Sequence, residues 1–251
     1  MQEHPFFKRY RIDKKEFSAG QNKTYIGYLI ARLEKLPPPP VPGRCCIECF
    51  GLTMNRGGGW MSFAGPPATA ATGLLPKDCF STAPAGSGEV TTVELEPNRT
   101  GFHVLELETV AGGLRLVSAH VNKTRFDVYK DEVKESARFA KWVSGLPPGR
   151  VVLITITDTA IAAKRPPGRD LYAALEALGA DPAMERIGYR LPFALIGVKG
   201  GGPGSALQAM DKTKILLRLE ASVGAAAGGG VGLEGTATER TDITELMLSE
   251  D

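Results

Sequence analysis

Apolar and β-branched positions in the middle of the chain predict a series of short strands. Glu89–Glu96 and Phe102–Val110 are two of them, separated by a turn at Pro97-Asn98. The paired glycines of Ala111-Gly-Gly113 tolerate the positive φ angles of a tight hairpin, which leads into a strand over Leu114–Val121. Three later strands are expected, at Val151–Thr157, Arg190–Lys199 and Lys214–Glu220. The first of these is an uninterrupted apolar run, which is typical of a central strand.

Two segments with helical spacing of apolar residues lie among these strands. Asp131 is a suitable N-cap for a helix that reaches about Ser144, where Gly145 and two prolines end it. The side chains expected on its buried face are Val133, Ala137, Ala140, Trp142 and Val143. A second helix is expected over Asp170–Leu178, closed by Gly179. Because strands and helices are mixed without strict alternation, the pattern favours an α+β fold for one domain over residues 45–222.

Residues 1–44 have the pattern of a basic N-terminal arm. Asn22 is expected to cap a short amphipathic helix that begins near Lys23. Its apolar stripe consists of Tyr25, Leu29, Leu33 and Leu36. The prolines at 37–40 end the helix and continue to Pro42 as a stiff polyproline segment. The stripe must be buried either on the chain's own domain or on a partner, and the pattern does not choose between them.

Residues 223–251 have the composition of a linker followed by an acidic tail. The segment Gly224–Gly232 contains almost only glycine and alanine, which is typical of a flexible linker. After it, Asp242–Leu248 is expected to form a helical turn or two on contact with a partner. A basic head and an acidic tail often mark arms that reach other surfaces.

Composition then limits the class of protein. Apolar residues make up 43% of the 251 residues and charged residues 23%, which fits a globular protein. The formal net charge of +2 excludes a chain-wide polyelectrolyte that coats nucleic acid. The longest apolar run, Val151–Ile156, is too short to cross a membrane, and the first twenty residues are too charged for a signal peptide. A cytoplasmic protein with no membrane or nucleic-acid partner is therefore expected.

Motifs of catalysis are absent from the sequence. Neither a phosphate-binding G-x-x-x-x-G-K-[ST] loop nor a G-x-S-x-G or H-E-x-x-H motif occurs. Strand alternation places His103 on the same face as Leu105 and Leu107, where a structural histidine is expected. We therefore expect no enzyme and no cofactor.

The four cysteines do not have the spacing of a metal site. Cys46 and Cys49 form one C-x-x-C pair, but Cys45 is adjacent to it and Cys79 stands alone, so no metal is expected. A disulfide between Cys49 and Cys79 is one alternative, and a pair of buried thiols in a reducing cytosol is the other.

An ordered set of short motifs resembles a known family. The motifs are Gly59-Trp-Met-Ser-Phe63, Pro76-Lys-Asp-Cys-Phe80, Asn98-Arg-Thr-Gly-Phe-His-Val104, Gly113-Leu-Arg-Leu-Val117, Arg125-Phe-Asp-Val-Tyr129, Leu146-Pro-Pro-Gly149, Gly188-Tyr-Arg190 and Ala194-Leu-Ile-Gly-Val-Lys-Gly200. Over about residues 49–200 the chain resembles the GG domain of the interleukin-like EMT inducer and pancreatic-derived factor (ILEI/PANDER) family. The same module forms the stem of the protein O-mannose N-acetylglucosaminyltransferase.

The resemblance implies a compact antiparallel β-sandwich-like module with two or three flanking helices and no catalytic activity. In the glycosyltransferase stem the module acts as a lectin, and the positions here that match its sugar contacts are Arg99, Asp158 and Arg190. The alternative role for these three residues is an internal Arg–Asp network that braces loops. Where the family has Asp-x-Trp after the last arginine, this chain has Leu191-Pro-Phe193, which removes a carboxylate and an indole ring.

Together these features predict a structural interaction protein. We expect its arms, residues 1–42 and the C-terminal tail, to hold the ILEI-like domain in a large intracellular assembly of protein subunits, such as a ciliary or microtubule-associated one. Glycan binding by the three-residue site is the alternative function.

Overall fold

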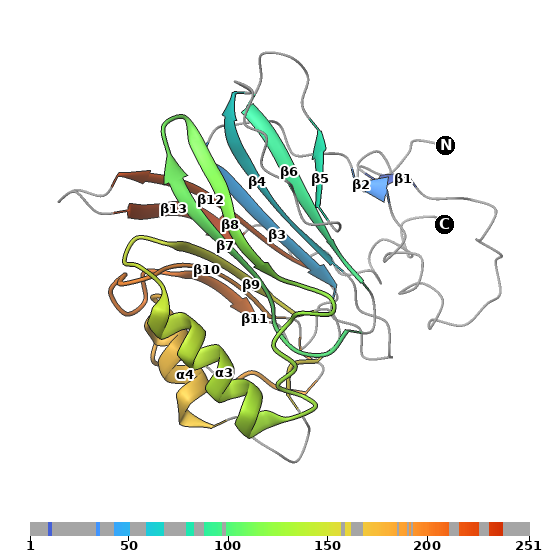
Figure 1. The fold of residues 1–251 in the computed structure, drawn as a ribbon, viewed down its shortest axis with the longest axis vertical. Coiled ribbons are helices and arrows are strands. Elements are labelled where there is room, and N and C mark those ends of the chain that lie inside the picture. Colours follow the sequence, from blue (N-terminus) through green and yellow to red (C-terminus); the bar gives the residue numbers. More distant parts are fainter. Residues whose placement is uncertain are drawn as a thin grey trace, which may run out of the picture.

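The computed structural model (Figure 1) describes most of the chain between Gly43 and Ala237. The described residues are 10–11, 34–35, 43–50, 59–67, 79–82, 88–96, 99–156, 159–161, 168–184, 186–189, 191, 193–210, 216–225 and 231–237. Statements about structure below refer to these residues.

One antiparallel sheet has the strand order β11-β10-β9-β7-β8. Its strands are β7 (His103–Val110), β8 (Gly113–His120), β9 (Val151–Thr155), β10 (Phe193–Val198) and β11 (Leu207–Met210). All five residues of β9 are buried, so the prediction of a central strand is confirmed. Val110 pairs with Gly113, which confirms the two-residue hairpin turn at Ala111 and Gly112.

A second antiparallel sheet has the order β13-β12-β3-β4-β6-β5. Its strands are β3 (Arg44–Phe50), β4 (Gly59–Pro67), β5 (Cys79–Thr82), β6 (Gly88–Leu95), β12 (Leu216–Ala225) and β13 (Val231–Ala237). Sequence patterns predicted β6 and part of β12, but they did not predict β3, β4, β5 or β13.

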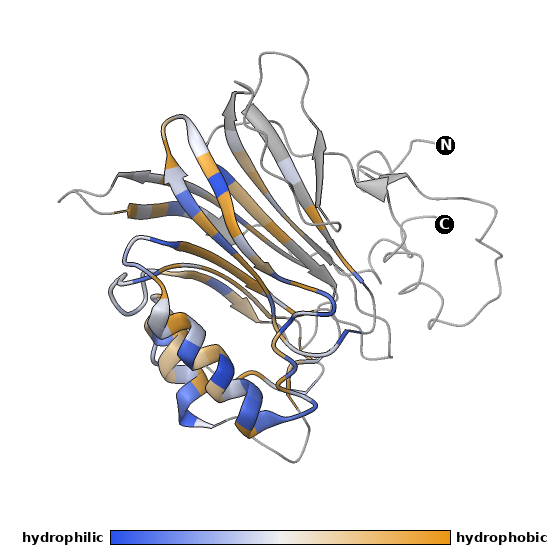
Figure 2. Cartoon of the chain, in the orientation of Figure 1, coloured by the Kyte–Doolittle hydropathy of each residue, from blue (hydrophilic) through white to orange (hydrophobic). Residues whose placement is uncertain are grey.

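Two hydrophobic clusters connect these sheets and the helices. In the first cluster, Met61 and Phe63 of the six-stranded sheet pack with Leu105 and Leu153 of the five-stranded sheet. The second cluster joins the other face of the five-stranded sheet to α3 (Glu132–Gly145) and α4 (Arg169–Glu176). Figure 2 shows that the helices carry polar residues on their outer sides. The predicted α+β class with a high strand content is thus confirmed.

Helix α3 begins as predicted but buries a different face. Asp131 is the N-cap, and the backbone N–H of Lys134 donates to its carboxylate at 3.1 Å. Val133 is 81% exposed and Ala137 is exposed as well, so the predicted face was wrong at these two positions. The buried residues are Ser136, Phe139 and Val143. Phe139, the largest fully buried side chain of the helix, decides the orientation, because burying its ring removes a large apolar surface from water.

The cap gives a prediction of modest size. Replacing Asp131 by alanine is expected to lower the free energy of unfolding by about 1 kcal/mol, because an orphan N–H of the first turn loses its acceptor. Urea unfolding followed by circular dichroism measures this, with Asp131→Asn, which keeps a capping oxygen, as the matched control. Equal destabilisation by both variants would contradict the capping role.

The glycine-rich segment near the C-terminus forms part of a hairpin, so the prediction of a flexible linker over 224–232 was wrong at its described residues. β12 and β13 pair from Leu219↔Ala237 to Ala225↔Val231, which extends the sheet to Ala237 and beyond the predicted domain end at 222. A Cβ on Gly235 would lie 2.3 Å from the Glu220 carbonyl oxygen. Close backbone approach thus requires glycine at Gly235, whereas the described glycines of 224–232 are paired in the hairpin, which composition cannot distinguish from flexibility.

The prediction of an N-terminal helix was wrong at its two described residues. β2 (Glu34–Lys35) pairs with β1 (Tyr10–Arg11) instead. At these two residues, pairing with a segment distant in the sequence overrides the helical spacing of the apolar positions. The docking residues Tyr25, Leu29, Leu33 and Leu36 lie outside the described residues, as does the tail segment Asp242–Leu248.

The strand order bears on the two cysteine alternatives. Cys49 lies on β3 and Cys79 on β5, and β4 and β6 separate these strands. Three interstrand spacings place the two backbones about 14 Å apart, whereas disulfide-bonded Cα atoms lie within about 7 Å. This register is not that of a disulfide-bonded pair, and the alternative of buried thiols stays a prediction. Cys45 and Cys46 are buried and not disulfide-bonded, and burial raises the pKa of Cys45 to about 12.

Candidate interaction site

Three strands of the five-stranded sheet bring loops together at one end. His103 at the start of β7 pairs with Thr155 at the end of β9, and Thr155 pairs with Ala194 near the start of β10. The chain segments that precede β7, follow β9 and precede β10 therefore emerge at the same edge. We call this edge the His103 end.

Gly101 allows two of these segments to approach closely. Its N–H donates to the carbonyl oxygen of Thr159 at 2.7 Å, and the adjacent Phe102 forms a bridge with Phe126. Gly101 has φ +97, and a Cβ at this position would lie 2.2 Å from the Phe126 carbonyl oxygen. Only glycine fits this contact without displacement of the backbone.

His103 is a structural residue, as predicted. Its ring is completely buried, Nδ1 accepts from the Asn122 N–H at 3.2 Å, and Nε2 lies 3.3 Å from the Arg99 carbonyl oxygen. Burial lowers the pKa of His103 to about 3, so the ring is neutral at physiological pH. Asn122 has φ 49, and its side chain accepts from the Glu96 N–H at 2.8 Å. The two residues thus connect the start of β7 to the segment after β8.

Arg125 connects the same segments through its guanidinium. Nε donates to the Thr100 carbonyl oxygen, and Nη1 donates to the Asn122 carbonyl oxygen at 2.7 Å. Nη2 forms an ion pair with Asp127 at 2.7 Å. The second oxygen of the Asp127 carboxylate accepts from the Thr100 hydroxyl at 2.7 Å. Every nitrogen of this guanidinium is therefore hydrogen-bonded within the protein.

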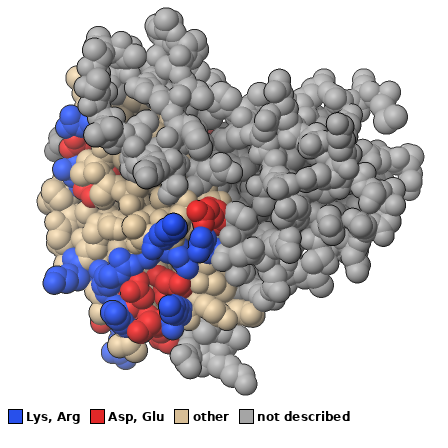
Figure 3. All heavy atoms as spheres, turned by 45° about the vertical axis from the view of Figure 1, so that its right-hand side comes forward, with Lys and Arg blue, Asp and Glu red and all other residues tan. Residues whose placement is uncertain are grey.

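Helix α3 closes the network. Glu135 accepts from the Asp127 N–H at 3.0 Å and from two nitrogens of Arg138, at 2.6 and 2.9 Å. Arg138 also lies over the Phe126 ring, with its guanidinium carbon 4.2 Å from the ring centroid. Figure 3 shows acidic and basic side chains side by side on the described surface. The charged groups of this network are used to brace loops.

The structure describes one of the three residues that match a sugar site. Arg99 donates to Glu96, with nitrogen–oxygen distances of 2.5 and 2.7 Å. Asp158 and Arg190 lie outside the described residues, so their clustering with Arg99 stays a prediction. Phe193, which stands where the family has an indole, is completely buried with its centroid 6.1 Å from that of Phe102. Its ring faces the core and is not available to a ligand.

Sequence patterns missed an exposed aromatic pair at this end. The rings of Tyr129 and Tyr189 are stacked, with centroids 6.5 Å apart and an interplanar angle of 22°. Each side chain belongs to a residue that is 39% exposed. Tyr129 lies just before α3, and Tyr189 lies in the segment that leads to β10. Both residues belong to motifs given in the sequence analysis. The sequence signal that could have identified them is an aromatic residue within a polar loop. We call these residues the tyrosine pair.

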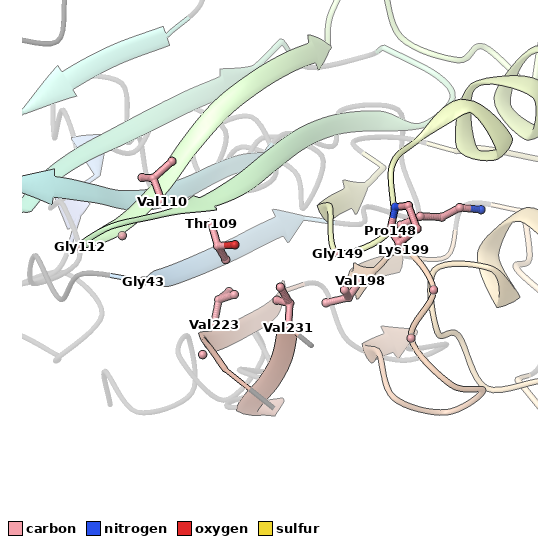
Figure 4. A pocket seen from close by; sticks show the side chains of 14 residues that line it. Gly43, Thr109, Val110, Gly112, Pro148, Gly149, Val198, Lys199, Val223 and Val231 are labelled. Atoms are coloured by element: carbon pink, nitrogen blue, oxygen red, sulfur yellow. The ribbon is translucent and has the colours of Figure 1, made fainter. Parts of the chain in front are cut away.

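A hollow lies at the opposite end of the two sheets. It has a volume of about 880 Å³ and is lined by glycines and by apolar side chains that include Val110, Val198, Val223 and Val231 (Figure 4). Gly43, the first residue of the described domain, also lines it. The hollow therefore marks the end of the molecule at which the N-terminal segment joins β3.

The described residues show neither a metal-binding cluster nor a membrane-spanning helix. They contain no group of three or more His, Cys, Asp or Glu residues placed to hold a metal ion. None of their helices is long and apolar enough to cross a membrane.

Comparison with known proteins gives one match. The family model described as Interleukin-like EMT inducer matches residues 101–201. This range covers β7 to β10 together with α3 and α4, so the resemblance is confirmed over residues 101–200. No curated protein matches the chain.

Proposed function

We propose that this chain, whose residues 101–201 match the interleukin-like EMT inducer family model, is a non-catalytic interaction protein held in a larger intracellular assembly. The tyrosine pair is the observation that carries this proposal. The two stacked residues are each 39% exposed, and tyrosine supplies a large contact area at a small cost in side-chain entropy.

The surroundings of the tyrosine pair favour a protein partner. Asp127 and Arg125, close to Tyr129 in the chain, already form ion pairs and hydrogen bonds within the protein. A partner at this surface therefore gains mainly from contact with the aromatic rings. The hydrogen bonds and the ion pair of the network hold the segment that leads to Tyr129, and such preorganisation lowers the entropy lost on binding.

The terminal segments extend the proposal beyond the domain. The stripe of Tyr25, Leu29, Leu33 and Leu36 and the acidic tail are the proposed docking elements for neighbouring subunits. A cytoplasmic assembly of the cytoskeletal or ciliary kind fits a chain with a basic head and an acidic tail.

Incorporation of tagged chains into the native assembly tests the proposal. Two altered chains are compared: one lacks residues 1–42, and the other carries both Tyr129→Ala and Tyr189→Ala. Each is expected to reduce co-purification with the assembly at least tenfold, because each lacks one docking element. Val117→Ala is the matched control, since Val117 is 43% exposed on β8 and belongs to neither element. Wild-type incorporation of both altered chains, with the fold retained in circular dichroism, would rule the proposal out.

Glycan binding is the second candidate, and the tyrosine pair is the observation that favours it. An exposed aromatic face is what a sugar ring stacks on, and Tyr189 immediately precedes Arg190 in the sequence. Titration with N-acetylglucosamine, followed by amide shifts, tests this function. Saturable shifts around Arg99 and Arg190 with a dissociation constant below about 1 mM would favour glycan binding over the protein-partner proposal. Such a constant corresponds to a binding free energy near −4 kcal/mol.

A further inference from the structure

We propose that the tyrosine pair binds a polyproline segment, and that this segment is Pro37–Pro42 of a second copy of the chain. The inference rests on the proposed function, because it names the partner of the same surface. It predicts that copies of this chain associate head to tail.

The chemistry of the tyrosine pair suits proline. The pair offers stacked aromatic faces, while the nearby carboxylate of Asp127 is occupied by Thr100 and Arg125. A polyproline segment presents flat apolar rings and has no backbone N–H groups that need an acceptor. Its extended conformation is also largely formed before binding, so little entropy is lost on docking to aromatic residues.

This chain carries such a segment. Four consecutive prolines at 37–40, followed by Val41 and Pro42, lead directly into Gly43. Proline fixes φ near the polyproline II value, so the run is a preformed ligand in sequence terms.

The position of Gly43 decides which copy supplies the segment. Gly43 lines the hollow together with Val110 and Gly112, at the end of β7 opposite His103 (Figure 4). The tyrosine pair is carried by loops at the His103 end. Along β7, His103 and Val110 are seven residue steps apart, or about 23 Å at 3.3 Å per step.

The segment is too short to cover this distance within one molecule. Six residues in a polyproline II conformation span about 19 Å at 3.1 Å per residue. The segment would also have to cross from the six-stranded sheet to the far side of the five-stranded sheet, about 10 Å more. The prolines of one copy therefore reach the tyrosine pair of a neighbour and not their own.

Such a contact is heterologous, since each copy donates one segment and accepts another. Repetition of a heterologous contact gives a ring if the rotation closes and an open filament if it does not. Both outcomes fit a subunit of a larger assembly.

Complementary variants test the inference by sedimentation velocity on the full chain. The acceptor variant carries Tyr129→Ala and Tyr189→Ala, and the donor variant carries Pro38→Ala and Pro40→Ala. The wild-type mass is expected to rise with concentration, while each variant alone associates at least tenfold more weakly. An equimolar mixture of the two is expected to form a dimer that does not extend, because one intact segment meets one intact pair.

Three controls make the result decisive. Val117→Ala should associate like the wild type, and the double change Tyr129→Phe and Tyr189→Phe should too, because it keeps the aromatic faces. Thermal midpoints within a few degrees of the wild type show that the variants are folded. Loss of association in the phenylalanine variant would assign binding to the hydroxyl groups and overturn the proline contact.

Other outcomes also overturn the inference. A wild type that stays monomeric, a variant mixture that stays monomeric, or displacement of the contact by N-acetylglucosamine would each do so. If the wild type is monomeric while the acceptor variant still fails to enter the native assembly, the proposed function stands and only the identity of the partner is wrong.

Discussion

Replacement of Gly101 by alanine is expected to destabilise the protein by about 3–5 kcal/mol, because the change combines backbone strain with a steric clash. The residue has φ +97, and the new Cβ would lie 2.2 Å from the Phe126 carbonyl oxygen and 2.7 Å from the Asp127 Cα. Both obstacles are backbone atoms, so no side-chain rotation relieves the contact. The free energy of unfolding of a domain of ordinary stability is only about 5–15 kcal/mol, so this change removes a large part of it.

Calorimetry or denaturant unfolding measures this effect, and Gly145→Ala is its matched control. Gly145 ends α3, has no atom within 4 Å of its would-be Cβ, and does not have a positive φ. Alanine there is expected to be neutral or to stabilise by about 0.5 kcal/mol, by reducing the entropy of the unfolded chain. Similar stabilities for the two variants would mean that the loop at Gly101 is not held as described.

Acidification is expected to destabilise the protein through His103. The unfolded histidine titrates near pH 6.5, while burial lowers the pKa of the folded residue to about 3. Between these values the unfolded chain binds one more proton than the folded protein, so stability falls as the pH falls. The loss from this residue amounts to about 2.5 kcal/mol between pH 6 and pH 4.

The variant His103→Gln separates this effect from the titration of carboxylates. Glutamine is polar but does not titrate, so the variant is less stable at pH 7 yet loses less stability on acidification. The measured quantity is the difference between the two slopes of unfolding free energy against pH, expected to approach about 1.4 kcal/mol per pH unit near pH 5. Parallel slopes would show that His103 does not stay neutral in the folded protein.

The sequence by itself determined the features that depend on neighbouring residues. The hairpin at Ala111 and Gly112 follows from the φ angles that glycine permits, and the start of α3 follows from the capping oxygen of Asp131. The run at Val151 predicted a central strand, because continuous apolar character requires burial on both faces. The buried role of His103 followed from strand alternation in the same way.

Only the tertiary structure decided the features that depend on distant residues. Helical spacing allowed several faces of α3 to be buried, and the contacts of Phe139 with Phe102 and Phe126 selected one. The glycines of β12 and β13 have the composition of a linker, and only the pairing of the two strands shows that they belong to a sheet. Tyr129 follows β8 and Tyr189 precedes β10, and they meet because the pairing of β8, β7, β9 and β10 places the end of β8 and the start of β10 at one edge. Periodicity describes one segment at a time, whereas the surface available to a partner is set by contacts between segments.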